Sequence, residues 1–223
     1  MAFVTLSCSL RWDRGQPYGF QRALVTHVRA NMEYFKSENI VNYMDDAYAK
    51  FGRLLQEQGY FNEAEILANE VLGTRNTILG VEHPDTIHAM ASLAVIYQNL
   101  GKYTEAEKLG IQVVTTRNRI LGVDHPDTIL AMGNLVTTYD ELGKYTEAKK
   151  LGIQVLIAMS RSLGGEHPHT ITAMGNLAAT YESMGEYKKA EGMEIQVLDA
   201  MNRILGVEHP DTINAMANLA ATY

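Results

Sequence analysis

Between residues 83 and 124 the apolar positions follow a helical spacing in two successive stretches. In the first stretch they are spaced i, i+3, i+4 and i+7, which predicts a helix from about Pro84 to Leu100. These apolar residues are Met90, Leu93, Ala94 and Tyr97. The second stretch predicts a helix from about Thr104 to Leu121. Its expected buried face is Ala106, Leu109, Gly110, Val113 and Ile120. Because the turn between the helices is so short, they must lie antiparallel, as a hairpin.

The residues at the ends of these helices support the same boundaries. Pro84 suits the first helical position, where its missing N–H costs nothing. Asp85 lies next to it, where a carboxylate favours the positive end of the helix dipole. Gly101 can adopt the left-handed conformation that ends the first helix, and Gly122 follows the second. We expect His83 to be the N-cap or turn residue before the proline.

The hairpin pattern recurs with a fixed period along the chain. The pair His-Pro begins at residues 83, 125, 167 and 209, within HPDTI three times and HPHTI once, at 167. Blocks 83–124 and 125–166 are identical at more than half of their positions. Glycine recurs at 59, 101, 143 and 185, which places a degenerate repeat at 41–82. A fixed period of this length predicts stacked hairpins whose neighbours complete each other's core.

The period divides the chain into a short leading segment and an array. Residues 1–38 do not repeat, and Phe20–Phe35 reads as a helix, so we expect a helical cap or junction there. The array spans 39–223. Its repeats are 41–82, 83–124, 125–166, 167–208 and a half repeat at 209–223. Because Tyr223 falls inside the first helix of a fifth repeat, we expect a truncated or engineered chain whose open end can self-associate.

Small residues mark the places where helices must approach closely. Ala94, Ala106 and Gly110 are such positions in the second repeat. Two counterparts are larger, Val136 in the third repeat and Glu194 in the fourth. We expect looser or shifted packing at these two residues.

Composition and charge exclude several classes of protein. The 223 residues carry a formal net charge of −7, with 46% hydrophobic and 20% charged residues, which is globular and disfavours nucleic-acid binding. Cys8 is the only cysteine, so no intrachain disulfide can form. No apolar run is long enough to span a bilayer, and Ala2–Leu10 lacks the flanks of a signal peptide. We expect a cytoplasmic protein that does not bind membranes.

The repeat resembles the tetratricopeptide repeat. The words that carry the resemblance are Leu93-Ala94-x-x-Tyr97 and Gly101-x-Tyr103-x-x-Ala106. The 42-residue period with its HPDT start looks like the kinesin light chain type. LGVEHPDTI at 79–87 and 205–213 is closer still to the C-terminal arrays of fungal NB-ARC or NACHT NLR-like proteins. Gly110 and Val113 depart from the usual pattern of the second helix. The resemblance implies an all-α fold, a right-handed α-solenoid of stacked antiparallel hairpins.

In such a solenoid the first helix of each repeat lines the concave face, so the resemblance implies a peptide-binding groove there. The residues that we expect in the groove are Ser92, Gln98, Asn99, Asn134, Thr137, Asp140, Glu141, Asn176, Glu182 and Asn218. Asn134, Asn176 and Asn218 share one register. Similar domains use this asparagine to bind peptides, because an amide can pair with any extended backbone. In the alternative interpretation, each asparagine bonds only to the adjacent helix.

Charge indicates the kind of peptide. Relatives that grip a terminal carboxylate need Lys or Arg in the groove, and only Lys50 and Arg53 in the degenerate repeat are candidates. Asp140, Glu141 and Glu182 make the middle of the groove acidic instead. We therefore expect a basic or neutral protein segment as the partner.

Catalytic and metal chemistry is not indicated. The periodic histidines should stand about 8–10 Å apart or more, whereas zinc needs nitrogens about 2.0–2.1 Å from one ion. His88 and His169 read as surface residues. Cys8 has no patterned histidine partner, and the chain contains no GxxxxGK[ST] phosphate loop. We expect no cofactor, no metal and no enzymatic activity.

Three functions stay open at this point. The first is a protein-interaction module, the sensor or scaffold arm of a larger NLR-like signalling protein. The second is a kinesin-light-chain-like cargo adaptor with the same period. The third is a structural or self-associating solenoid fragment that binds no peptide, since near-identical repeats can arise by expansion alone.

Overall fold

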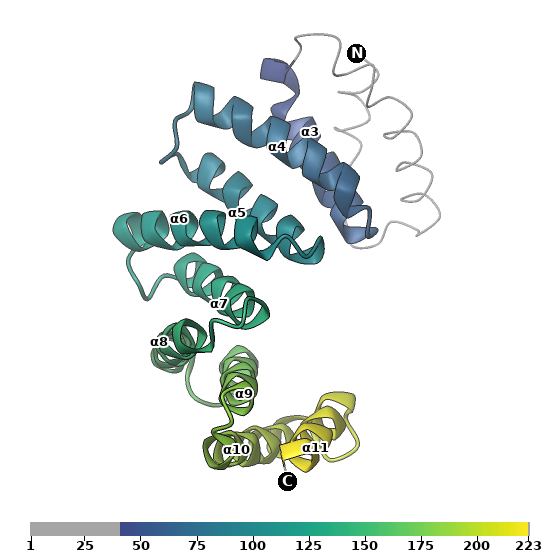
Figure 1. Ribbon diagram of the computed structural model, residues 1–223, viewed down its shortest axis with the longest axis vertical. Helices are drawn as coiled ribbons and strands as arrows, with labels where there is room; N and C mark the ends of the chain where they lie inside the picture. The colour runs from purple at the N-terminus through teal and green to yellow at the C-terminus, as the bar shows by residue number, and fades with distance from the viewer. Residues whose placement is uncertain (1–40, 223) are drawn as a thin grey trace. The chain divides into compact units, whose positions relative to one another are not determined.

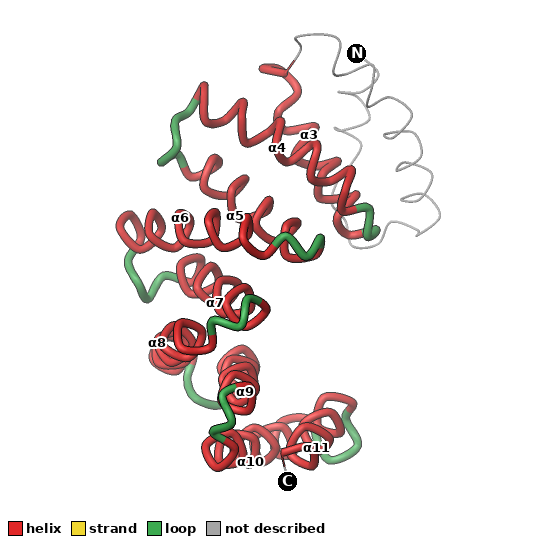
Figure 2. Tube along the Cα trace, in the orientation of Figure 1, coloured by secondary structure: helices red, strands yellow, loops and turns green. Residues whose placement is uncertain are grey.

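A computed structural model describes residues 41–222, and the expected N-terminal helical segment 1–38 and Cys8 lie outside them. Over these residues the chain is helical (Figures 1 and 2). The helices are α3 (Val41–Glu57), α4 (Phe61–Ile78), α5 (Pro84–Asn99), α6 (Tyr103–Leu121), α7 (Pro126–Glu141), α8 (Tyr145–Leu163), α9 (Pro168–Ser183), α10 (Tyr187–Leu205) and α11 (Pro210–Thr222). The prediction of an all-α fold of helix hairpins is confirmed. The predicted limits of the two helices at 84–121 agree with α5 and α6 to within one residue.

The described residues form two compact units, divided between Leu109 and Gly110, so the boundary falls within α6. In the first unit α4 packs against both α3 and α5. Its core centres on Phe51, Leu54 and Leu55, which are at most 1% exposed. In the second unit each helix from α7 to α11 packs against the next one. Its core includes Met132, Ala148 and Ile171.

Each described first helix that follows a His-Pro pair begins with the same cap. The Nδ1 atom of His83 accepts a hydrogen bond of 3.2 Å from the backbone N–H of Asp85, and His83 has an extended backbone. The same bond, with the same length, recurs at His125, His167 and His209. The expectation of a histidine N-cap is confirmed, because an imidazole acceptor satisfies one of the donors left open at a helix start.

Each hairpin turns at a glycine after its first helix. At the end of α5, Gly101 has φ of +70°, and its N–H donates to the carbonyl of Gln98. The N–H of Lys102 donates to the carbonyl of Tyr97, which completes a Schellman motif. Glycines with positive φ occur at 59, 80, 101, 122, 143, 164, 185 and 206. The backbone therefore turns at a constant interval, twice in each sequence period.

The close approach expected at Gly110 is confirmed within the second unit. A Cβ there would lie 3.1 Å from the Cδ1 atom of Leu135, and one on Gly152 would lie 3.2 Å from that of Leu177. Ile120, predicted to be buried, is 45% exposed, so that prediction is wrong. From α5 to α10 each first helix has 16 residues and each second helix has 19, and the residues that end α6, Ile120 and Leu121, are both exposed.

Candidate functional site

The candidate site is a pocket in the second unit, formed by α7, α8 and α9. It has a cavity volume of about 210 Å³. Its lining residues are Ile129, Leu130, Gly133, Asn134, Val136, Thr137, Gly152, Val155, Met159, His169, Thr172, Ala173, Asn176 and Leu177. We call it the α7–α9 pocket. It is smaller than the roughly 300–1,000 Å³ of sites for whole small molecules, so it suits one or two inserted side chains.

The two asparagines of the pocket occupy equivalent positions on α7 and α9. Asn134 is half-buried and Asn176 is exposed. The backbone carbonyls of these residues accept hydrogen bonds from Thr138 and Thr180, four residues further along each helix. Within the described residues, the side-chain amide of Asn176 makes no hydrogen bond to the chain. Its donors and acceptor can therefore pair with a guest.

A glycine on α7 and apolar side chains on α8 determine the space in the α7–α9 pocket. A Cβ built on Gly133 meets no atom within 4 Å, so this glycine leaves open space on the wall. The α8 side supplies Val155, which is 4% exposed, and Met159. Leu130 stands at the edge with 59% of its surface exposed. A partner that covers this edge would remove apolar surface from water.

The pocket lining carries no Asp, Glu, Lys or Arg, and His169 is its one imidazole. The other HPDT starts have aspartate at this position: Asp85, Asp127 and Asp211. His169 is exposed, as predicted, and its ring centroid lies 5.2 Å from that of His167. The lining can therefore take an uncharged guest without leaving a buried charge unpaired.

The acidic residues expected in the groove lie outside this lining. Asp140 is half-buried, and its Oδ2 atom accepts a hydrogen bond of 3.1 Å from the Thr180 hydroxyl on α9. Burial raises the pKa of the Asp140 carboxyl, against the opposing effect of that hydrogen bond. Glu182 similarly accepts a hydrogen bond from Thr222, while Glu141 is exposed. Asp140 and Glu182 thus connect neighbouring first helices.

The remaining predicted groove residues are dispersed. Asn218 is exposed on α11 and does not line the α7–α9 pocket. The side chain of Asn99 donates to the carbonyl of Val95 on its own helix, at 2.8 Å. Gln98 is half-buried near the end of α5, and Thr137 is exposed and lines the α7–α9 pocket. The structure therefore brings together Asn134, Asn176 and Thr137.

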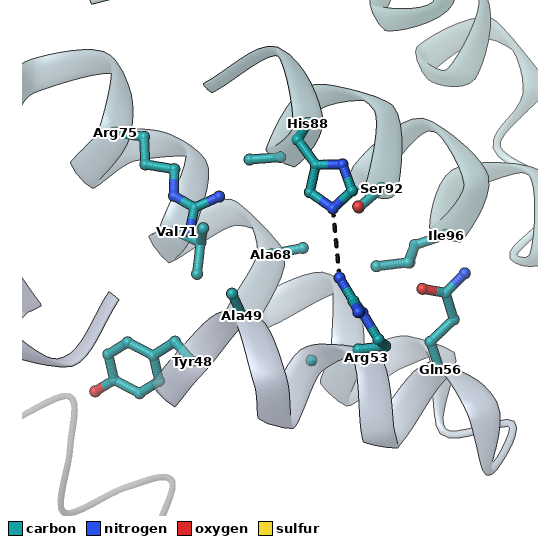
Figure 3. A pocket seen from close by; sticks show the side chains of 12 residues that line it. Tyr48, Ala49, Arg53, Gln56, Ala68, Val71, Arg75, His88, Ser92 and Ile96 are labelled. Carbon is teal, nitrogen blue, oxygen red and sulfur yellow. Dashed lines mark hydrogen bonds between the residues drawn. The ribbon is translucent and has the colours of Figure 1, made fainter. Parts of the chain in front are cut away.

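A second pocket lies in the first unit, between α3, α4 and α5, and contains Ser92 (Figure 3). We call it the α3–α5 pocket. Arg53 and His88 face each other across it, with Nη2 and Nε2 atoms 3.4 Å apart. Arg75 from α4 also lines it and donates to the carbonyl of Asp85 at 3.0 Å. Its cavity volume is only about 60 Å³, and its lining carries the basic or imidazole side chains of Arg53, Arg75 and His88 and no Asp or Glu.

The sequence patterns did not identify Arg75, Val155 and Met159 as pocket residues. All three lie on second helices, whereas the groove was predicted from first helices alone. Only the packing of α4 and α8 against their neighbours brings these side chains into the pockets.

Among residues 41–222, no group of three or more His, Cys, Asp or Glu side chains could hold a metal ion. In the same part of the chain, every helix is too short or too polar to cross a membrane.

Comparison with known families identifies the repeat. Residues 46–85 and 86–127 match one family model described as tetratricopeptide repeat, and residues 141–203 match a second model with the same description. Together the matches cover more than half of the chain. The predicted tetratricopeptide resemblance is confirmed. No curated protein matches the chain in sequence.

Solved structures show the same fold. The chain is similar to the nearly identical TPR-like repeats of a Podosopora anserina protein assigned provisionally as a kinesin light chain. The identity is 27% and the TM-score 0.74, over 83% of this chain and 87% of that one. BtubC (BKLC) from P. vanneervenii is 21% identical with a TM-score of 0.72, over 93% of this chain and 84% of that one. The apo form of RapI is 14% identical with a TM-score of 0.67, over 91% of this chain and 60% of that one.

Tetratricopeptide arrays of this kind are typical of protein–protein interaction scaffolds and are typically non-catalytic.

Proposed function

We propose, from the premise that the chain belongs to the tetratricopeptide repeat family, that it binds an extended protein segment in the α7–α9 pocket. The observation that carries the proposal is the meeting of Asn134 and Asn176, at one register on successive first helices, in a single pocket. An amide at each position can donate to a peptide carbonyl and accept from a peptide N–H.

The pocket also favours a class of segment. Because its lining contains no Asp, Glu, Lys or Arg, it suits an uncharged segment. Leu130 and Met159 offer apolar surface to one of the segment's side chains. The segment backbone would then pair with the two amides while that side chain enters the cavity, as in other recognition of extended peptides.

The test uses the full chain and an array of short immobilised peptides of neutral, basic and acidic composition. For a neutral or basic peptide that binds, changing Asn134 and Asn176 together to alanine should weaken binding at least about tenfold, because two backbone pairings are lost. The matched control is Asn99→Ala, whose amide bonds to its own helix. Unchanged affinity of the double variant, with a native helical circular dichroism spectrum, would refute the proposal.

A second candidate function is a kinesin-light-chain-like cargo adaptor in the cytoplasm. The likeness to the Podosopora anserina repeats favours it, since it is 27% identical over most of both chains. A role as the sensor or scaffold arm of an NLR-like protein rests on the LGVEHPDTI resemblance. The complete open reading frame separates the two roles. An upstream nucleotide-binding module supports the NLR-like role, and a heptad coiled coil supports the adaptor.

A further inference from the structure

Two ion pairs at equivalent places in the array have opposite polarity. In the first unit the Nζ atom of Lys102, in the turn before α6, lies 2.7 Å from Glu65 on α4. In the second unit the turn before α10 carries the acid instead. Glu186 there lies 3.0 Å from the Nζ atom of Lys149 on α8. Both pairs join residues 37 apart, and the second is displaced from the first by two whole repeats.

The surroundings of the two pairs show that they are the same structural element. Lys102 lies over the ring of Tyr97, 5.8 Å from its centroid. Lys149 lies over the ring of Tyr181, also 5.8 Å from its centroid, although it comes from the opposite partner of the pair. An ammonium group of the pair therefore lies near the tyrosine two residues before the end of the first helix, whichever element supplies it, and Lys189 is a second one at Tyr181.

The sequence shows how the polarity of this pair compares between repeats. The second-helix position is Glu65, Glu107, Lys149 and Glu191 in successive repeats, and the turn position is Lys102, Lys144 and Glu186. Only the pair Lys149 and Glu186 has reversed polarity, and both of its members are reversed. Attraction within this pair is kept, while a turn that carries Glu186 would repel a second helix that carries glutamate.

We infer that the reversed pair of Lys149 and Glu186 is a stacking key. It lets the fourth hairpin pack on the third and disfavours its packing on any hairpin with glutamate at that position, in this chain or in a second copy. Such a key matters because blocks 83–124 and 125–166 are so alike in sequence that their backbones offer nearly the same packing surface.

Burial makes this pair suitable as a key. The side chains of Lys149 and Glu186 are each 27% exposed, so solvent screens them less than it screens a surface pair. Two other pairs in the second unit also join residues 37 apart, Arg161 with Asp124 and Arg203 with Glu166. Their side chains are 48–69% exposed, and both pairs keep one polarity. They supply a matched control.

The experiment is a charge-reversal cycle in the full chain: Lys149→Glu, Glu186→Lys and both together. Every variant carries Lys189→Ala, because Lys189 also donates to Glu186 and would oppose a lysine there. Each single change brings like charges together and should lower the unfolding midpoint, and the double change should recover it. Additive single effects, with no recovery, would show that the pair carries no coupling energy and would overturn the inference.

Refolding from denaturant then tests specificity, with the Lys189→Ala chain as reference. The double variant has lost the reversed polarity, so its ratio of mis-stacked dimer to monomer should rise about two- to fivefold by light scattering. High salt should raise the same ratio for the reference chain. The control double variant Asp124→Arg/Arg161→Asp should change the ratio far less. A K149E/E186K variant that refolds to monomer as completely as the reference would refute the key.

Discussion

The two pockets share one plan and differ in their charge. Each is formed by two successive first helices and the second helix between them. The α3–α5 pocket contains Arg53, Arg75 and His88 in about 60 Å³, whereas the α7–α9 pocket has His169 as its one basic group in about 210 Å³. The repeated glycines and histidines determine where the helices begin and end. Residues off the apolar stripe determine the charge of each pocket. Separate substitutions can therefore test the packing of the helices and the binding properties of the pocket lining.

The largest expected effect comes from removing a wall of the α7–α9 pocket. Leu177 is 1% exposed and packs on Gly152. Leu177→Ala should cost about 2–5 kcal/mol of unfolding free energy, and the α3–α5 pocket should keep its structure. Thermal unfolding followed by circular dichroism measures the loss. The control Leu177→Met should cost less than about 1.5 kcal/mol. An alanine variant as stable as the methionine one would contradict the described packing.

The next effect separates stability from binding. Gly133→Ala places a methyl group in the open space of the pocket wall, and Gly175→Ala makes the same change outside the lining. Both should stabilise their helices, by about 0.5–1 kcal/mol. Only Gly133→Ala should weaken peptide binding, by about tenfold or more, because an added methyl fills space that the guest needs. Titration of the bound peptide into each variant distinguishes the two. Equal affinities would show that the guest does not enter beside Gly133.

A smaller effect should follow from giving the α7–α9 pocket the charge of the other repeats. His169→Asp restores the residue found at 85, 127 and 211. Stability should change little, because the cap uses the backbone N–H of residue 169. Affinity for basic peptides should rise by a few-fold at low salt and return to the original value at high salt. A change of equal size for neutral and basic peptides would contradict this electrostatic explanation.

The smallest expected effect concerns Asp140, which lies between first helices. Because burial raises its pKa in the folded state, the charged carboxylate costs stability once the pH exceeds the ordinary aspartate range. Asp140→Asn should therefore raise the unfolding midpoint at pH 7 by about 1–3 °C, and the difference should vanish below about pH 4. Unfolding curves across this pH range measure it. If the gain in unfolding midpoint grew as the pH fell, the pKa of Asp140 would be lowered by folding and not raised.

The sequence predicts the helices, turns and caps better than it predicts the residues that line the pockets. The limits of α5 and α6, the Gly101 turn and the histidine caps follow from local chemistry, so the pattern of apolar, glycine and proline residues contains them. Gly133 and Asn134 could be placed on the groove side of a first helix in the same way. Val155 and Met159 could not be assigned to the pocket, because their roles depend on how α8 packs between α7 and α9. The error at Ile120 has the same origin, since the burial of a residue in the last turn of a helix depends on how that helix packs against other helices.

The glycine turns also bear on how a gene for such a chain can change. Because the turns recur at half the sequence period, removing or duplicating one whole period that starts at any of these glycines leaves every remaining turn at the same spacing. Recombination between near-identical repeats can thus lengthen or shorten the protein by a whole hairpin without a new turn having to arise. Loss of one residue inside a helix would instead shift every later side chain on that helix by about 100° around its axis.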